Sequence, residues 1–298
     1  MSLRELLKKS ATLRGLSQDL KSTNILVKNK RARQQGAAIR SSSKNGEAVA
    51  SNSGTSIIRE LKENLYDNHS PFDSVDLSYV DHGYPDTEIV PELLDVLFTK
   101  IIEPRFILEC GSMLGGSAMV MAKLIKRLGL GAEIVCVDPF TGDVNMWDWE
   151  INPGWKFLRL EQGIPTIYKR FLANVANEGL DDKIISINCT TTVGIPLLKR
   201  LHEKGRISSI PNYIYLDSAH EPDETLLELR LCWGLLENGG ILLGDDWGWD
   251  AVRNDVLKFS GEIEIDQDRL KMAHEMLAGS EIVEGKILIY SGQWVLFS

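Results

Sequence analysis

The chain has 298 residues and 43% of them are hydrophobic, which is enough for one large buried core or two small ones. No apolar run approaches the roughly 20 residues that a membrane-spanning helix needs, and the amino-terminal sequence lacks the apolar stretch of a secretory signal. The cysteines stand singly in apolar patterns, which indicates free thiols and a cytoplasmic protein. They are Cys110, Cys136, Cys189 and Cys232.

The net charge of −9 is unevenly distributed. Residues 1–49 hold eleven Lys or Arg against three acidic residues, a charge of +8, which leaves −17 for the rest of the chain. So acidic a body excludes nucleic acid as the expected substrate. The basic segment could contact RNA, an acidic partner or a membrane surface, or it could be solvated or fold back on the acidic body.

The amino-terminal third divides into two parts by composition. We expect residues 1–55 to form a basic extension, partly helical or flexible, because leucines at helical spacing give way to a polar Ser- and Gly-rich stretch. Residues 56–104 are expected to form a helical or irregular lid segment. Within it, Pro91 opens a helix that runs through Lys100. The main domain is expected to cover residues 105–298.

Apolar strand patterns alternate with helical patterns along this main domain. The alternation predicts an α/β fold with a doubly wound, mostly parallel sheet. Two further short β-like runs around Ser291 and Gly292 near the carboxyl end bring the expected sheet to seven strands. The parallel strands are expected at residues 106–110, 134–138, 184–188, 213–217 and 241–245.

A glycine turn follows the first of these strands. Glu109 lies at the strand end, Gly111, Gly115 and Gly116 form the turn, and a helical pattern runs from about Ser117 to Arg127. Bare backbone at a helix start can approach a nucleotide closely. Asp138, roughly 20 residues beyond the glycines and at the end of the next strand, can hold two ribose hydroxyls. These features fit either a dinucleotide or S-adenosylmethionine.

The glycine spacing separates the two possibilities. It reads G-x-x-x-G-G rather than the G-x-G-x-x-G of dinucleotide folds, which disfavours a dehydrogenase. Glu109-x-Gly111 resembles the first motif of class I methyltransferases, where the acidic residue lies beneath the ammonium end of S-adenosylmethionine. The resemblance implies that the main domain is a Rossmann-like methyltransferase domain. It implies cofactor contacts from Glu109, Gly111, Ser112, Gly115, Gly116, Ser117, Asp138 and Asp217.

A second group of polar residues follows two later strands. Asp217 ends the strand at 213–217, His220 comes three residues later, and Asp245 and Asp246 end the strand at 241–245. Neighbouring strands lie about 5 Å apart, and ligands bind at the carboxyl edge of such sheets. Clustered carboxylates call for a counter-charge, and oxygen ligands suit Mg²⁺ or Mn²⁺. We therefore expect Asp217, Asp245 and Asp246 to hold one divalent cation.

Asp217-x-x-His220, the Gly239-Gly240 turn and Asp245-Asp246 resemble the metal-dependent sugar O-methyltransferases of the macrocin and mycinamicin type. The resemblance covers roughly residues 90–260. It implies that the three aspartates bind Mg²⁺ and that His220 and Asp217 are catalytic, with His220 as the general base. The expected reaction is methylation of a hydroxyl on a small polar molecule, a sugar or a glycosylated natural product, by a homo-oligomer.

Two alternatives stay open beside this hypothesis. A catechol-type O-methyltransferase is also metal-dependent, but that family typically has Asn at the position of Asp246. A non-catalytic binding or scaffold protein could retain the cofactor fold. The tryptophan-rich loop after Asp138 holds Trp147, Trp149 and Trp155, which can stack on an acceptor ring or pack as a lid.

Overall fold

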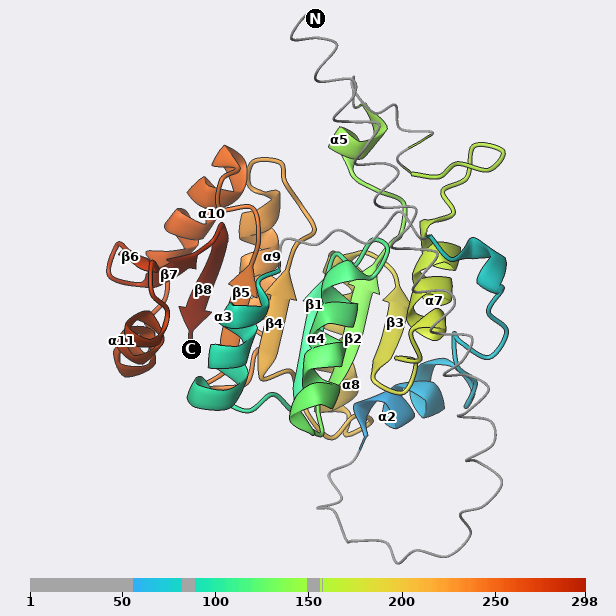
Figure 1. The fold of residues 1–298 in the computed structure, drawn as a ribbon, viewed down its shortest axis with the longest axis horizontal. Coiled ribbons are helices and arrows are strands. Elements are labelled where there is room, and N and C mark those ends of the chain that lie inside the picture. Colours follow the sequence, from blue (N-terminus) through green and yellow to red (C-terminus); the bar gives the residue numbers. More distant parts are fainter. Residues whose placement is uncertain (1–55, 82–88, 149–155, 157) are drawn as a thin grey trace, which may run out of the picture. The chain divides into compact units, whose positions relative to one another are not determined.

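The computed structural model describes residues 56–81, 89–148, 156 and 158–298. The predicted extension over residues 1–55, together with Trp149 and Trp155, lies outside the described residues. An eight-stranded sheet with the order β3-β2-β1-β4-β5-β8-β7-β6 forms the centre of residues 56–298 (Figure 1). The strands are β1 Phe106–Cys110, β2 Glu133–Asp138, β3 Ile184–Asn188, β4 Tyr213–Leu216, β5 Ile241–Gly244, β6 Glu281–Val283, β7 Ile287–Tyr290 and β8 Gln293–Phe297.

Strands β1 to β5 are parallel, and each coincides within one residue with a strand predicted from sequence. Their residues are almost continuously buried and rich in Ile, Leu and Val, as expected for strands covered on both faces. Leu108 of β1 pairs with Val135 on one side and with Ile214 on the other. This register brings the ends of β1, β2, β4 and β5 to one edge of the sheet.

The carboxyl-terminal strands make the sheet one strand larger than predicted. The predicted pair forms as β7 and β8, and β8 runs antiparallel to both β5 and β7. The additional strand is β6, which pairs with β7 across a turn at Glu284 and Gly285. Since β6 is only three residues long and is not fully buried, its sequence has no alternating pattern from which a strand is predicted.

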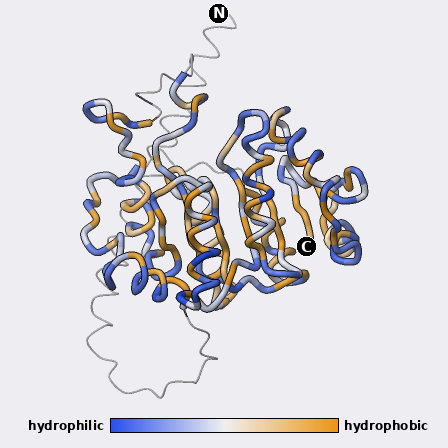
Figure 2. The backbone as a smooth tube through the Cα atoms, turned by 180° about the vertical axis from the view of Figure 1, so that it is seen from behind, coloured by the Kyte–Doolittle hydropathy of each residue, from blue (hydrophilic) through white to orange (hydrophobic). Residues whose placement is uncertain are grey.

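Helices cover both faces of the sheet, and each face has its own hydrophobic cluster. Apolar side chains of α3, α4, α7 and α11 pack on one face, and those of α2, α8, α9 and α10 pack on the other. In Figure 2, accordingly, hydrophobic residues are concentrated in the central part of the fold. The helices are α2 Ile57–Leu65, η1 Leu77–Tyr79, α3 Pro91–Val96, η2 Leu97–Ile101, α4 Gly116–Leu128, α5 Val144–Trp147, α7 Ile167–Asn177, α8 Thr191–Glu203, α9 Glu224–Trp233, α10 Asp250–Ser260 and α11 Gln267–Met276.

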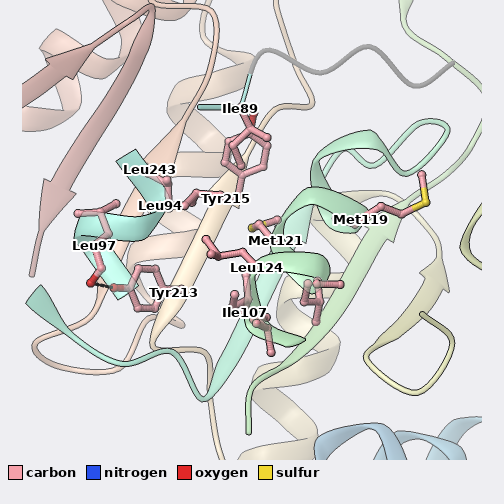
Figure 3. Packing of buried hydrophobic residues seen from close by; sticks show 14 of the residues in the cluster. Ile89, Leu94, Leu97, Ile107, Met119, Met121, Leu124, Tyr213, Tyr215 and Leu243 are labelled. Atoms are coloured by element: carbon pink, nitrogen blue, oxygen red, sulfur yellow. Dashed lines mark hydrogen bonds between the residues drawn. The ribbon is translucent and has the colours of Figure 1, made fainter. Parts of the chain in front are cut away.

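The helix predicted from Pro91 to Lys100 forms as α3 and continues into η2, which is a π-helix. Figure 3 shows Leu94 and Leu97 of this helix packed beside Tyr213 and Leu243 from strands β4 and β5. The Tyr213 hydroxyl donates to the Leu97 carbonyl at 2.8 Å and lies 2.6 Å from the Ile102 carbonyl. A buried tyrosine thus caps carbonyls at the end of the helix and fixes it to the sheet.

Helix α2 is the first described element of the segment 56–104, for which the lid role stays a prediction. Glu133, at the amino end of β2, accepts hydrogen bonds from the Ser56 hydroxyl and the Ile58 N–H. The Tyr66 hydroxyl, just after α2, donates to the Ser186 carbonyl in β3. These contacts hold α2 at the end of the sheet opposite to the predicted site. The side chains of Ile57, Ile58 and Leu61 are buried in the core there. None of the described helices is long and apolar enough to cross a membrane.

Candidate active site

A cavity of about 780 Å³ opens at the carboxyl ends of β1, β2, β4 and β5. Its walls come from the loops that follow these strands and from the first turns of α4, α8 and α9. Most of the predicted site residues line this cavity. They are Gly111, Ser112, Gly116, Ser117, Asp138, Asp217, His220, Asp245 and Asp246.

Two glycines of the turn have backbone conformations that favour glycine. Gly111 has φ +82° and Gly115 has φ +88°. A Cβ atom on Gly111 would lie 1.8 Å from the carbonyl oxygen of Asp217. Only glycine therefore allows the loop after β1 to approach the loop after β4, and this approach places the turn beside Asp217.

Glu109 lies beneath the turn and is completely buried. Its carboxylate accepts hydrogen bonds from the hydroxyls of Ser112 at 2.5 Å and Ser117 at 2.6 Å, and from the Cys136 thiol at 3.2 Å. Burial raises its pKa to about 7, although these hydrogen bonds act in the opposite direction. A carboxyl group with a raised pKa is therefore buried beneath the glycine turn and is not among the residues that line the cavity.

Asp138 is bonded to the same turn through its backbone. Its Oδ2 accepts hydrogen bonds from the N–H groups of Ser112 at 2.7 Å and Met113 at 2.8 Å, and its Oδ1 accepts one from Phe140. Burial raises the pKa of Asp138 despite these donors. The ribose contact expected from sequence stays a prediction, and the structure adds a contact that fixes the glycine turn. We call Glu109, Ser112, Ser117 and Asp138 the cofactor side of the cavity.

The acceptor side, which we define as Asp143, Asp217, His220 and Asp246, lies across the cavity. His220 is held between two carboxylates, with Nδ1 2.9 Å from Asp143 and Nε2 2.8 Å from Asp246. Asp217 lies 3.8 Å from the same Nε2. Asp246 takes this position with φ +60°, a left-handed conformation at the end of β5.

Asp143 was not predicted as a site residue. It follows β2 in the loop that leads to α5, where its other oxygen accepts the Met146 N–H at 2.8 Å and caps the helix. Its place beside His220 brings together residues 77 positions apart. The sequence around Asp143 indicates at most a helix N-cap, because Asp143 directly precedes α5, a helix of four residues in the loop after Asp138.

The acceptor side is electrostatically crowded. Burial would lower the pKa of His220, but the hydrogen bonds to Asp143 and Asp246 and the nearby Asp217 carboxylate outweigh it and raise the pKa to about 12. Burial raises the pKa of Asp217, and the charges of Asp246 and Asp143 add to this effect. Burial would also raise the pKa of Asp143, but the hydrogen bond from His220 lowers it below the ordinary value.

Asp217, His220 and Asp246 could together hold a cation, since one ligand atom from each lies within 4.8 Å of the others. Two carboxylates and one imidazole make an oxygen-rich donor set that fits Mg²⁺ or Mn²⁺. Asp245, the third predicted ligand, is 6% exposed and accepts a hydrogen bond from the buried Tyr215 hydroxyl at 3.2 Å. The three possible metal ligands that lie together in the structure are therefore Asp217, His220 and Asp246, whereas the sequence predicted Asp217, Asp245 and Asp246.

One further polar residue of the cavity, Glu228, was missed by sequence reasoning, whereas Trp249 was expected as a pocket wall because it follows the acidic pair. Glu228 of α9 is 6% exposed and accepts hydrogen bonds from the hydroxyls of Thr191 and of Ser218, the latter at 2.7 Å. The Trp249 ring lies 5.3 Å from the His220 ring. Of the tryptophan-rich loop, Trp147 is exposed and donates to the Thr141 carbonyl. This leaves open whether the loop contacts an acceptor.

Comparison with protein families gives a match over the strands around this cavity. The family model described as "Methyltransferase domain" matches residues 108–247, from the middle of β1 to just beyond Asp246. That span contains every residue of the cofactor and acceptor sides. A comparison with curated proteins found no match.

Solved structures with a similar chain path include several methyltransferases. One is CalS11, a TDP-rhamnose 3′-O-methyltransferase of calicheamicin biosynthesis, with 19% identity over 69% of this chain and 78% of that chain and a TM-score of 0.42. The O-methyltransferase TomG from Streptomyces achromogenes has 16% identity, with 72% and 84% covered and a TM-score of 0.38. An O-methyltransferase from Bacillus cereus has 14% identity, with 80% and 89% covered and a TM-score of 0.37. Likeness this distant carries no information on the acceptor.

Proposed function

We propose that the protein is an S-adenosylmethionine-dependent O-methyltransferase assisted by Mg²⁺ or Mn²⁺, since residues 108–247 match the methyltransferase family model and lie on a mostly parallel sheet. The expected acceptor is a hydroxyl of a small polar molecule, a sugar or a glycosylated natural product. One observation carries the proposal: Asp217, His220 and Asp246 converge in the same cavity as the glycine turn. A methyl donor and a hydroxyl acceptor can meet there at close range.

The cofactor side supports binding of the methyl donor. The backbone of Gly111 and the start of α4 offer close approach and N–H groups, and Asp138 is available at the end of β2 for ribose hydroxyls. Glu109 lies beneath the turn, where the resemblance to class I methyltransferases places an acidic residue under the ammonium end of S-adenosylmethionine. The sulfonium of this cofactor supplies the methyl group when it is bound.

The acceptor side supports activation of a hydroxyl. Asp217 and Asp246 would hold the divalent cation, whose positive charge lowers the pKa of the acceptor hydroxyl when it is bound. With these carboxylates so engaged, His220 loses part of the negative charge that keeps it protonated. Its Nε2 can then take the proton of the hydroxyl, while Asp143 holds Nδ1 and fixes the orientation of the ring.

The proposal is tested by calorimetric titration of S-adenosylmethionine with and without Mg²⁺, followed by methyl-transfer assays on a panel of glycosides and catechols. We expect S-adenosylmethionine to bind with or without the metal, and turnover to disappear in excess chelator and return with added Mg²⁺. Binding of NAD in place of S-adenosylmethionine would exclude the reaction. Full turnover in chelator would exclude the metal, and a preference for catechols would exclude a sugar acceptor.

A further inference from the structure

The charged side chains that line the large cavity are nearly all carboxylates. Its only basic side chain among the described residues is His220, and no described Lys or Arg lines it. Of the undescribed residues, 82–88, 149–155 and 157 contain no Lys or Arg in their sequence, and residues 1–55 contain eleven. The carboxylates are Asp138, Asp143, Asp217, Glu221, Glu224, Glu228, Asp245 and Asp246.

Two of these carboxylates are not used by the proposed chemistry. Glu224 is the first residue of α9 and Glu221 lies in the loop before it, and neither makes an ion pair with a described Lys or Arg. Glu221 accepts one hydrogen bond, from the Asn145 amide at 3.1 Å. Bound cofactor and a divalent cation would offset charge on the acceptor side, but Glu221 and Glu224 would keep the entrance negative.

A smaller cleft of about 410 Å³ adjoins the large cavity, and both are lined by His220 and Glu221. Asp223 and Asp250 line it, and their nearest cations, Lys258 and Arg253, are already paired with them. Asp255 accepts the Leu226 N–H and also faces the cleft. Ion pairs therefore balance two carboxylates of this cleft, and its remaining carboxylates, Glu221 and Asp255, form no ion pair with a described Lys or Arg.

The rim of the two cavities also exposes apolar surface. Val144 and Leu227 line the large cavity and are 58% and 50% exposed, and Trp249 lines the smaller cleft and is 43% exposed. Indole faces stack on rings and attract cations, whereas they do not favour anions. Carboxylates and apolar surface together fit a neutral or positively charged molecule with a ring or hydrocarbon body.

We propose that the acceptor is a neutral or amine-bearing hydroxyl compound that carries no phosphate or carboxylate. This inference rests on the proposed methyl transfer and narrows its substrate class. A sugar carried on a nucleoside diphosphate would bring two phosphate charges into a cavity lined by carboxylates. The reaction that supplies the acceptor is therefore a glycosyl transfer or hydrolysis that has already released the nucleotide, and methylation follows it.

The first test measures the charge at the rim without any acceptor. Fluorescence quenching of Trp249 by caesium, iodide and acrylamide is taken as the difference between the native chain and Trp249→Phe, with S-adenosylmethionine and Mg²⁺ present. After normalisation to free N-acetyltryptophanamide, caesium should quench at least about threefold more efficiently than iodide at low salt. The difference should shrink with added salt. Equal quenching, or stronger quenching by iodide, would overturn the proposal.

The second test uses acceptors matched in size and different in charge: methyl glucosaminide, methyl glucoside, methyl glucuronide and UDP-glucose. We expect kcat/KM to fall along this order, with the anionic probes at least about tenfold below the neutral one. Glu224→Lys should narrow the difference, and Glu281→Lys, an equal charge change on the exposed strand β6, should leave it unchanged.

The outcomes separate this inference from the proposed function. Preferred methylation of methyl glucuronide or UDP-glucose would overturn the inference and leave the methyltransferase proposal intact. Failure to bind S-adenosylmethionine would overturn the proposed function. If S-adenosylmethionine binds but none of the four probes is methylated, the quenching ratio still decides the sign of charge that the rim admits.

Discussion

The carboxylates on the two sides of the cavity have different kinds of partners. On the cofactor side, Glu109 and Asp138 are buried and accept hydrogen bonds from nearby hydroxyl, thiol and backbone N–H groups. On the acceptor side, Asp143, Asp217 and Asp246 surround a single imidazole, and Asp217 and Asp246 are each 33% exposed. The cofactor side is thus complete in itself, whereas the acceptor side has excess negative charge that a cation can balance.

Replacing one acceptor-side carboxylate is expected to have the largest effect and to act on activity rather than folding. Asp217→Asn removes a ligand of the proposed cation, so turnover should fall by about 10³-fold or more. The same change relieves repulsion from Asp143 and Asp246. We therefore expect the metal-free fold to be stabilised slightly, by up to about 1 kcal/mol. Turnover assays and thermal unfolding in chelator measure the two effects.

Asp268→Asn, at the exposed first turn of α11, is the matched control for this comparison. It should change neither turnover nor metal affinity. If Asp217→Asn weakened the fold and left turnover unchanged, the acidic group would be part of the scaffold. The contrast between the two sides would then be wrong.

His220→Ala is expected to act on the same side with the opposite effect on stability. General-base contributions are typically 10²–10⁴-fold, so turnover should fall by about that factor while S-adenosylmethionine affinity stays nearly constant. Removal of the imidazole leaves three carboxylates facing one another. The metal-free protein should therefore unfold at a lower temperature, and Mg²⁺ should restore part of the loss.

Asp143→Asn gives the matched comparison for His220. It leaves the imidazole in place but weakens the hydrogen bond that orients Nδ1, so its turnover should lie between those of the native chain and His220→Ala. Near-normal turnover in His220→Ala would show that another group removes the proton. His220 would then be limited to binding the cation or organising the carboxylates.

The sequence predicted the strand ends well because parallel strands follow a simple physical rule. A short apolar run that ends in Asp or Glu specifies both a buried strand and a polar group at the carboxyl edge, as with Glu109, Asp138 and Asp217. Neighbouring strands then bring such groups together regardless of their separation in sequence. The fold and the location of the cavity follow from this rule.

The orientation of individual side chains could not be predicted in the same way. Asp245 and Asp246 are adjacent, but Asp245 accepts the Tyr215 hydroxyl in the core, and Asp246 reaches His220 through a left-handed backbone. Asp143 meets His220 through the path of a loop that has no periodic pattern. Such contacts depend on three-dimensional packing, which hydrophobic periodicity does not encode.

On the cofactor side, Glu109 is expected to affect stability in a pH-dependent way. Its folded pKa of about 7 lies above the ordinary value of 4.5, so the folded state retains a proton that the unfolded chain has already released. The free energy of unfolding should therefore fall as pH rises from about 4.5 to 7, at about 1.4 kcal/mol per pKa unit and by roughly 3 kcal/mol in total.

Glu109→Gln isolates this contribution, because the other raised groups titrate in both chains and cancel in the difference. Denaturant unfolding measured at several pH values gives the free energy of unfolding of both chains. Between about pH 4.5 and 7, the value for the native chain should fall toward that of Glu109→Gln, or below it. Parallel curves would mean that the Glu109 carboxyl is ionised in the fold throughout. A fixed negative charge would then lie beneath the glycine turn.

The smallest expected effect concerns Asp138, whose carboxylate has two candidate roles. Asp138→Ala should weaken S-adenosylmethionine binding by about 1.5–3 kcal/mol, on the order of tenfold or more, through loss of charge-assisted hydrogen bonds. Calorimetry measures the change. The loss alone does not distinguish a direct ribose contact from the observed anchoring of Ser112, Met113 and Phe140.

A cofactor analogue separates the two roles. If Asp138 binds the ribose, S-adenosylhomocysteine lacking the 2′-hydroxyl should bind the native chain more weakly than the complete product, and Asp138→Ala should no longer discriminate between them. If Asp138 only fixes the glycine turn, the variant should weaken both ligands equally and keep the preference for the hydroxyl. The second outcome would make Asp138, like Glu109, part of a pre-formed support whose hydrogen bonds are already satisfied, and would leave recognition of the ribose to the backbone of the turn.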